Sequence, residues 1–246
     1  MENCTIRDAA AKMQEWFGIS TVSHEAPPAS NPKPEEKAEL VSKNKKEKEE
    51  GENKPLKFAL QGIEANHPYL EGRGVYSATA HTFGIGYFSG RGSMSGRIVF
   101  EIRNEKGELL AYAGRAIDGS EPRYKFPAGF HKSHELYNLH RAIGEGNSRR
   151  RVVVVEGFFD CVKVSEAGFP CVALMGSSMS EAQAELLAKH FNVACILLDG
   201  DEAGQLAAMD CLTRLGRRMW VWAPALPEGK QPDMLSAEEI QLFVKK

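Results

Sequence analysis

Acidic side chains in the C-terminal half of the chain follow apolar runs at positions where they can act together on a cation. Glu156 directly follows the run VVVV, and Asp199 and Asp201 follow the run CILL with Gly200 between them. If these runs are buried parallel strands, their carboxyl ends meet at one sheet edge, where ligands bind in open α/β folds. Alternate residues of an extended chain face the same way, so Asp199 and Asp201 can share a cation. Gly200 would let a phosphate approach the backbone.

Two further acids belong to the same pattern. Asp160 lies four residues after Glu156, at the start of the next expected helix, and Asp233 follows the run MWVWAP after a short loop. Either acid alone is more often a helix cap or a loop carboxylate. Together, crowded carboxylates repel one another unless a cation neutralises them, and hard oxygen ligands suit Mg²⁺, with Mn²⁺ as the alternative. The whole set predicts a metal site for phosphoryl-transfer chemistry.

The elements that must position these acids are visible as alternating patterns. The apolar runs RVVVVE, FPCVALMG, NVACILLDGD and RRMWVWAP are separated by helical segments such as SEAQAELLAKHF and AGQLAAMDCLTRLG. Buried strands that alternate with helices indicate βαβ units. The sequence therefore predicts an α/β fold in which helices flank a parallel sheet.

The segment before this pattern predicts a smaller α+β unit. HPYLEGRGVYSATAHTFGIGYF indicates a short helix followed by a glycine-rich strand. RIVFEI, the turn RNEKGE and LLAYAGRAI alternate as a β-hairpin does, and residues 131–143 return to a helical pattern.

The first 55 residues differ in composition. Residues 5–17 fit a short amphipathic helix, whereas 14 of the 22 residues from Lys33 to Lys54 are Lys or Glu. With almost no large apolar side chains this stretch cannot offset the entropy of ordering, so we expect a disordered linker. A basic arm for DNA is the weaker interpretation, because Lys and Glu are equally numerous there.

Composition limits the classes of function. The formal net charge is −2, so contact with nucleic acid must be argued from local charge. The five cysteines are scattered without a CxxC pair, which favours buried thiols in a cytoplasmic protein and predicts no zinc in this chain. No stretch reaches the ~18 apolar residues of a membrane span, so we expect no membrane partner.

Basic residues stand around the expected hairpin and beyond it. By composition alone they form a solvated surface, but their places near strand ends would let them line a groove that leads to the acids and contact phosphates there. Tyr124 and Phe126 lie among them and would either stack on an unpaired base or pack into the core. The candidate nucleic-acid or nucleotide ligands are Arg97, Arg115, Arg123, Lys125 and Lys132.

These motifs resemble known families. VEGFFD, LLDGDEAG and QPD, with MGSSMSEAQAELL between the first two, resemble the signature of Toprim domains. Upstream, YLEGRGV, FGIGYF, GRIVFEIRNEKGELLAYAGRAI, PRY and FHKSHELYNLHRA resemble, in that order, the catalytic core of bacterial DnaG-type DNA primases. The resemblance covers roughly residues 66–234. The short segment between FGIGYF and GRIVFEI resembles a phage, plasmid or mobile-element form that lacks the zinc ribbon.

The resemblance implies roles for individual residues. The metal-binding acids of the family fall on Glu156, Asp160, Asp199, Asp201 and Asp233, of which Glu156, Asp199 and Asp201 would be catalytic. Arg115, Arg123 and Lys132 fall on basic positions that contact template or nucleotide phosphates. The final motif departs from the family's pattern, since Gln231 stands where a carboxylate is usual. This substitution would weaken the binding of one metal ion.

The resemblance also implies an organisation and an activity. We expect residues 1–20 to resemble the end of a zinc-ribbon module, 21–55 to be the linker, 56–148 a primase-like subdomain and 149–246 a Toprim domain. The implied function is that of a DNA-directed RNA polymerase-type nucleotidyltransferase, which makes RNA primers from ribonucleotides on single-stranded DNA in DNA replication. Its partners would be a replicative helicase or a separate zinc-ribbon module. A Toprim nuclease and a non-catalytic DNA-binding accessory protein of a mobile element remain as alternatives.

Overall fold

The computed structural model describes residues 51–144 and 150–245. The predicted helix over residues 5–17, nearly all of the predicted linker, and the predicted boundary at 148/149 lie outside the described residues. The last linker residues, 51–55, are described, and there the prediction of disorder is wrong at Asn53. Its side chain forms hydrogen bonds with His131 and Glu135.

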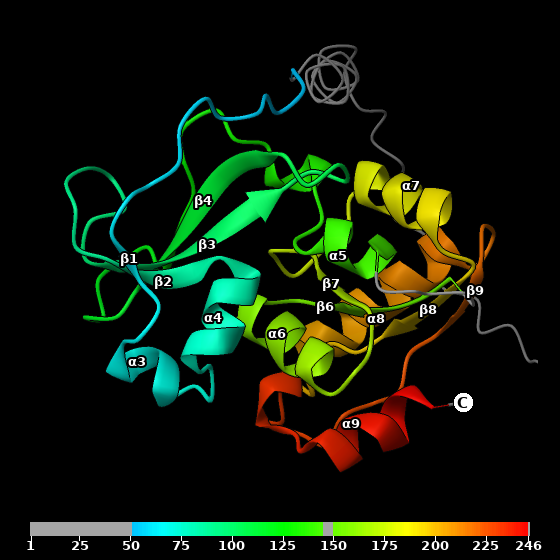
Figure 1. The fold of residues 1–246 in the computed structure, drawn as a ribbon. Coiled ribbons are helices and arrows are strands. Elements are labelled where there is room, and N and C mark those ends of the chain that lie inside the picture. The colour runs from blue at the N-terminus through cyan, green and yellow to red at the C-terminus, as the bar shows by residue number, and fades with distance from the viewer. Residues whose placement is uncertain (1–50, 145–149, 246) are drawn as a thin grey trace, which may run out of the picture. The chain divides into compact units, whose positions relative to one another are not determined.

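The N-terminal half is built on an antiparallel sheet with strand order β1-β2-β3-β4-β5 (Figure 1). The predicted hairpin forms the two long central strands, and its turn is held by Asn104, whose Oδ1 accepts the N–H groups of Lys106 and Glu108 at 3.0 and 2.9 Å. The strands are β1 (Ile63–Glu64), β2 (Ile85–Phe88), β3 (Arg97–Arg103), β4 (Leu109–Ala116) and β5 (Tyr124–Lys125).

Two segments of this half differ from the predicted elements. The single helix expected before the glycine-rich strand is two helices, α3 (Pro68–Glu71) and α4 (Ser77–Phe83), because Gly74 between them has a φ of 73°. The helix expected over residues 131–143 is divided into η1 (Lys132–His134) and α5 (Leu139–Gly144). Between these two elements the backbone of Tyr137 exchanges hydrogen bonds with Ala173 at 3.0 and 3.2 Å, which holds the chain extended.

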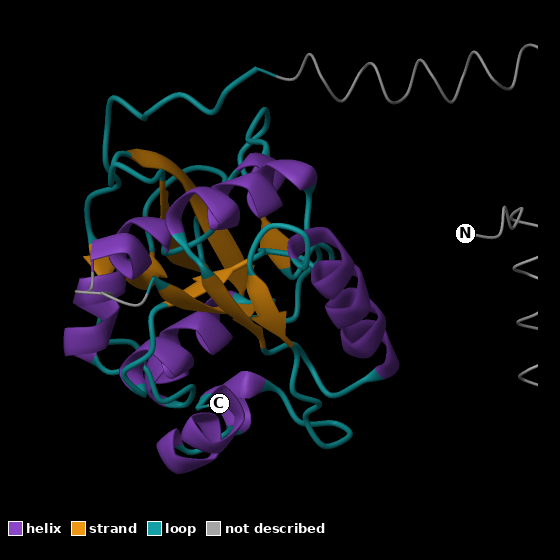
Figure 2. Cartoon of the chain, turned by 90° about the vertical axis from the view of Figure 1, so that its right-hand side faces the viewer, coloured by secondary structure: helices purple, strands orange, loops and turns teal. Residues whose placement is uncertain are grey.

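The C-terminal half confirms the predicted parallel sheet, with strand order β7-β6-β8-β9. Helices flank it, and Figures 1 and 2 show them on both sides of the strands. Among the residues that the structure describes, no helix is long and apolar enough to cross a membrane. The elements are β6 (Arg151–Val155), α6 (Phe158–Glu166), β7 (Cys171–Ala173), α7 (Glu181–His190), β8 (Val193–Ile196), α8 (Glu202–Leu215), β9 (Trp220–Trp222), η2 (Pro232–Met234) and α9 (Ala237–Val244).

The valine run of β6 is explained by burial on both faces. Val153 and Val155 belong to the core that includes α6 and α9, whereas Val152 and Val154 belong to the core that includes α5, α7 and α8. Each of these valines is at most 2% exposed. A strand covered on both sides has no solvent face, so polar residues do not alternate with apolar ones.

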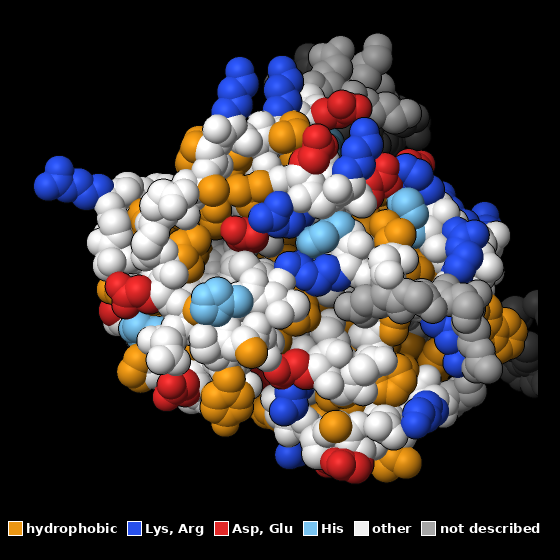
Figure 3. Space-filling view, viewed as in Figure 1, with side chains coloured by type: hydrophobic (Ala, Val, Ile, Leu, Met, Phe, Trp, Pro, Cys, Tyr) orange, Lys and Arg blue, Asp and Glu red, His pale blue; other side chains and the backbone are white. Residues whose placement is uncertain are grey.

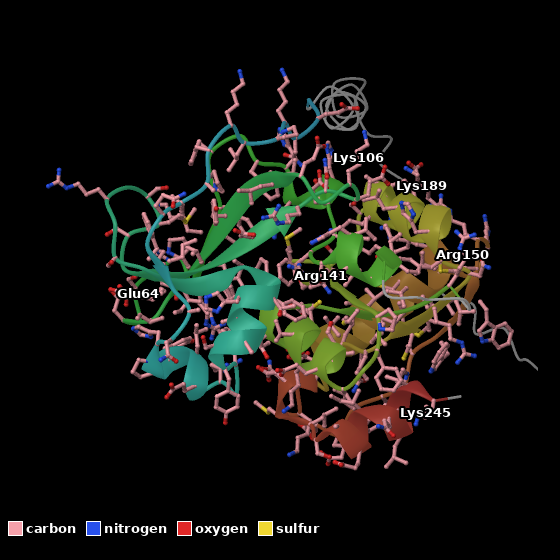
Figure 4. All side chains as sticks on the ribbon, in the orientation of Figure 1. Glu64, Lys106, Arg141, Arg150, Lys189 and Lys245 are labelled. Carbon is pink, nitrogen blue, oxygen red and sulfur yellow. The ribbon has the colours of Figure 1, made fainter. Side chains whose placement is uncertain are left out.

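The two sheets are joined by an aromatic core centred on Phe100 of β3. Its ring stacks on Phe158 of α6 at 4.6 Å between ring centroids and meets Phe159 edge-on at 5.2 Å. A second contact lies at the β3–β4 turn, near Lys106 and Lys189 as labelled in Figure 4, where Glu105 accepts hydrogen bonds from Lys189 at 2.7 Å. Both halves therefore depend on one another for burial.

This dependence predicts the effect of Phe100→Ala. Removal of a fully buried aromatic ring should lower the free energy of unfolding by ~3–5 kcal/mol and should do so for both sheets at once. Urea unfolding followed by far-UV circular dichroism and by the fluorescence of Trp220 and Trp222 in β9, in a Trp16→Phe background, tests this. Leu206→Ala, at a side chain that is 67% exposed, should change stability by no more than ~0.5 kcal/mol. Two separate transitions would contradict a shared core.

Candidate functional site

The order of the parallel strands creates a crevice between β6 and β8. From β6 the chain passes through α6 to β7 on one side, and from β7 it passes through α7 to β8 on the other side. Connections that leave adjacent strands in opposite directions open a crevice at their carboxyl ends, where ligands bind in such sheets. Glu156 directly follows β6, and Asp199 lies three residues after β8.

A pocket of about 120 Å³ lies at this crevice. The acids that line it come from the parallel half, and the arginines come from the antiparallel half. The structure thus brings together six of the residues predicted from sequence, namely Glu156, Asp160, Asp199, Asp233, Arg115 and Arg123. Asp201, Arg97, Lys125 and Lys132 are not among the lining residues.

Asp160 is the most buried of these acids, at 9% exposure. From the first turn of α6 its Oδ2 accepts the N–H of Gly157, and its Oδ1 accepts the N–H of Asp233, both at 3.1 Å. Burial, followed by the charges of Asp233 and Asp199, raises the pKa of Asp160 to about 7. Asp160 therefore links helix α6 to the segment that carries Asp233.

The remaining acids repel one another across the crevice. The pKa of Glu156 is raised by burial and then by the charges of Asp199 and Asp201, and the pKa of Asp199 is raised by burial and by Asp201 and Asp233. Asp201 is exposed and caps α8, where its Oδ1 accepts the N–H of Gly204 at 2.7 Å. Its charge still raises the pKa values of Glu156 and Asp199.

This donor set fits a hard divalent cation. Carboxylates whose mutual repulsion is unrelieved gain from a cation, and Mg²⁺ needs only one or two of them because it keeps waters and takes substrate phosphates. Within residues 51–144 and 150–245, no group of three or more His, Cys, Asp or Glu side chains is placed to hold a metal ion by itself. Water and substrate oxygens would complete the coordination.

Gln231 partly offsets the repulsion among these acids by donating a hydrogen bond to one of them. Its Nε2 donates to Oδ2 of Asp199 at 2.6 Å, which lowers the pKa of Asp199 against the effect of burial. The loop that carries Gln231 packs on Gly200, since a Cβ there would lie 2.1 Å from the carbonyl oxygen of Pro227. The expectation that Gly200 leaves room for a phosphate is therefore wrong, because the protein's own backbone fills that space.

Arg115 is held in place by two tyrosines. It is 7% exposed, and its Nε and Nη1 donate to the hydroxyl oxygens of Tyr69 at 2.6 Å and Tyr124 at 2.7 Å. Tyr124 and Phe126 pack against the core, as one of the two interpretations of these aromatic residues predicted. Fixed hydrogen bonds and burial give the guanidinium of Arg115 a defined direction at the pocket.

Arg73 lines the pocket, although it was not among the residues predicted to form the site. It forms an ion pair with Asp233, and its guanidinium lies 4.7 Å from the ring centroid of Phe159. The two charged residues are 160 positions apart in the chain. Its place in the motif YLEGRGV, beside Gly72 and Gly74, was the only signal that the sequence offered.

Three predicted basic residues lie outside the pocket. Arg97 donates to the carbonyl oxygens of Gly114 and Pro122 at 3.3 and 3.0 Å, and Lys125 lies on strand β5. Lys132 is exposed, donates to the Met175 carbonyl at 3.0 Å, and lies close enough to Glu156 to lower the pKa of that acid. On the face drawn in Figure 3, Lys and Arg side chains are interspersed with Asp and Glu.

The contact between Gly200 and Pro227 predicts a large effect of Gly200→Ala. The added methyl group meets a backbone oxygen that cannot swing away, so the free energy of unfolding should fall by ~1–3 kcal/mol or more. Urea unfolding monitored by circular dichroism measures this. The matched control is Gly144→Ala, because a Cβ at Gly144 meets no atom within 4 Å. Equal stability of the two variants would show that the Gln231 loop does not pack on Gly200.

Known proteins match both halves of this structure. Residues 91–143 match the family described as DNA primase catalytic core, N-terminal domain, and residues 153–236 match the family described as Toprim-like. A DNA primase of Listeria innocua is 33% identical over 204 residues, which cover 76% of this chain and 32% of that primase. The chain thus spans between about a quarter and a third of the length of the curated relatives that it matches.

Solved structures agree with the sequence matches. The zinc-binding and RNA polymerase domains of the Aquifex aeolicus primase have a TM-score of 0.66 and 25% identity, with coverage of 71% of this chain and 54% of theirs. A DnaG primase catalytic domain bound to single-stranded DNA has a TM-score of 0.62 and 26% identity, with coverage of 74% and 73%. In sequence and in fold, the described part of this chain is therefore a DnaG-type primase core with a Toprim-like C-terminal half.

Proposed function

We propose that this chain is a DNA primase-type nucleotidyltransferase, which joins ribonucleotides into RNA primers on a single-stranded DNA template during DNA replication. The observation that carries the proposal is the pocket in which acids at the β6–β8 crevice face arginines from the antiparallel half. A solved DnaG relative that binds single-stranded DNA supports the choice of template. Such a pocket suits a nucleotide, whose phosphates need cations on one side and guanidinium groups on the other.

The acids would hold the cation that the reaction needs, Mg²⁺ or in its place Mn²⁺. When bound, a divalent cation offsets the negative charge that develops on the transferred phosphoryl group. Glu156 and Asp199 at the crevice, with Asp201 beside them, are the proposed catalytic ligands. Asp160 and Asp233 support them from α6 and η2.

The basic residues would bind phosphates at two distances from the acids. Arg115 and Arg123 line the pocket itself, so they are placed for the nucleotide's phosphates, and Lys132 lies near Glu156 at its margin. Arg97 and Lys125 stand farther along the antiparallel sheet and are proposed to contact the template backbone. Contacts of this kind position the nucleic acid without reading its sequence.

The proposed organisation follows from the same reasoning. Residues 56–148 would form the primase-like subdomain and residues 149–246 the Toprim domain. The proposed partners are a replicative helicase or a separate zinc-ribbon module. Residues 1–20 would resemble the end of such a module and would be joined to the core through the part of the predicted linker that precedes Asn53. We propose that the protein acts in the cytoplasm.

Synthesis of short RNA tests the activity. Incubation of the chain with single-stranded DNA, Mg²⁺ or Mn²⁺ and labelled ribonucleotides should give oligoribonucleotides that are resolved by length. Glu156→Gln keeps the shape of the side chain but removes the charge that faces the cation. Because several kcal/mol of charge stabilisation depend on that cation, synthesis should fall by about a hundredfold or more.

The control is Glu185→Gln, at an exposed side chain of α7. It should retain synthesis within about twofold, because surface substitutions away from a site change little. Full activity of Glu156→Gln would overturn the assignment of the acids. Shortened DNA would identify a nuclease, and intact DNA without product would identify an accessory DNA-binding protein.

Cation binding is measurable without any turnover. Mn²⁺ should bind to the wild-type chain, with a decrease in the free-ion electron paramagnetic resonance signal, and should raise the melting temperature because it binds only the folded state. Glu156→Gln and Asp199→Asn should each weaken this binding, whereas Glu185→Gln should not. If Mn²⁺ affinity is the same in all four proteins, the cation does not bind at the crevice.

A further inference from the structure

The loop His131–Glu135, which carries Lys132, is held by two side-chain amides from distant parts of the chain. Asn53 contacts it from the segment that precedes β1, and Gln183 contacts it from α7. Neither residue lines the pocket. Both amides therefore act on the loop and not on the pocket itself.

Asn53 pairs with the backbone of His131 as a neighbouring strand would. Its Oδ1 accepts the N–H of His131 at 2.9 Å, and its Nδ2 donates to the carbonyl oxygen of His131 at 3.0 Å. The same Nδ2 donates to Oε1 of Glu135 at 3.0 Å. One side chain therefore fixes both ends of the loop, across 78 positions of sequence.

Gln183 holds the opposite side of the loop. It is 2% exposed, and its Nε2 lies 2.8 Å from the carbonyl oxygen of Glu135, 3.0 Å from that of Leu174 and 3.4 Å from that of Lys132. Its Oε1 accepts the N–H of Ser180, so the amide itself is fixed at the start of α7. A buried amide with all its partners satisfied allows the loop little freedom.

The fixed loop places the ammonium group of Lys132 at the edge of the catalytic crevice. Lys132 Nζ donates to the carbonyl oxygen of Met175 at 3.0 Å, and the N–H of Met175 donates to the carbonyl oxygen of Glu156 at 3.0 Å. Met175 has a φ of 61°, a left-handed conformation that turns its carbonyl toward the lysine side. Lys132 is thus connected to the backbone of Glu156 through the two hydrogen bonds of Met175.

We infer that Asn53 is a positioning residue that acts through Lys132 and fixes the distance of its ammonium group from the nucleotide's phosphates. The inference rests on the proposed function for the identity of the ligand. Gln183 holds the loop at Lys132 and Glu135, and Asn53 holds it at His131 and Glu135. Loss of Asn53 would loosen the His131 end of the loop, which precedes Lys132, while Gln183 and Ser180 still hold the loop to the start of α7 and the acids at the crevice stay in place.

The test compares Asn53→Ala with Lys132→Ala and with the double variant. Asn53→Ala should raise the KM for ribonucleotides about fivefold, the scale of one weakened hydrogen bond to a charged group, with kcat changed by less than about twofold. In the Lys132→Ala background the same substitution should have no further effect on KM, because there is no ammonium group left to position.

A second measurement needs no synthesis. Reductive methylation followed by mass spectrometry reports how fast the Lys132 amine reacts, and Asn53→Ala should speed this reaction severalfold by freeing the amine from Met175. Asn53→Asp keeps the size of the side chain but cannot donate to His131 and places a charge beside Glu135, so it should act in the same direction. Asn104→Ala, which removes a similar amide that bonds only within the β3–β4 turn, should leave both readouts unchanged.

The outcomes separate this inference from the proposed function. Unchanged Lys132 reactivity in both Asn53 variants, or an equal rise in KM with and without Lys132, would overturn the positioning role. If the wild-type chain makes no RNA, the proposed function fails, and the methylation rates alone still decide whether Asn53 positions Lys132. Faster methylation in both variants supports the inference in either case.

Discussion

Repulsion among carboxylates at one edge of the parallel sheet is the constraint around which the structure is arranged. Glu156 and Asp199 follow adjacent strands, so the fold itself forces their charges together, and burial makes the repulsion stronger. The protein compensates with neighbouring groups. Arg73 pairs with Asp233, the amide of Gln231 donates to Asp199, and two backbone N–H groups donate to the buried Asp160. The compensation is incomplete, and the proposed cation would relieve the repulsion that remains.

The antiparallel half supplies what the parallel sheet lacks, which is fixed positive charge opposite the acids. Arg115 comes from β4 and is held by Tyr69 and Tyr124, so its guanidinium does not have to be ordered when a ligand binds. This arrangement is useful only if the separation between the two halves stays constant. The contacts of Phe100 with Phe158 and with the pocket-lining Phe159 hold the two halves together.

Much of the fold and of the acidic site could be predicted because both depend on features that are local in sequence. A run of valines buried on two faces, followed at once by Glu156, reveals a strand and the acid at its carboxyl end together. Residues whose role depends on distant partners gave no such signal. Arg73 meets Asp233 across 160 positions and Asn53 meets His131 across 78, and neither spacing leaves a pattern in the sequence. Gly200 was interpreted locally, as space for a phosphate, when a distant carbonyl fills that space.

The comparison of Asp160 with Asp201 shows why motif position alone does not define a role. Both acids stand at the start of a helix, and both accept backbone N–H groups there. Asp201 is exposed, so it can turn toward a cation at little energetic cost, whereas Asp160 is buried and uses its second oxygen to hold the N–H of Asp233. A cation that drew on Asp160 would have to break that bond and move the segment that carries Asp233. We therefore propose that Asp160 supports Asp233, and that direct coordination falls to Glu156, Asp199 and Asp201.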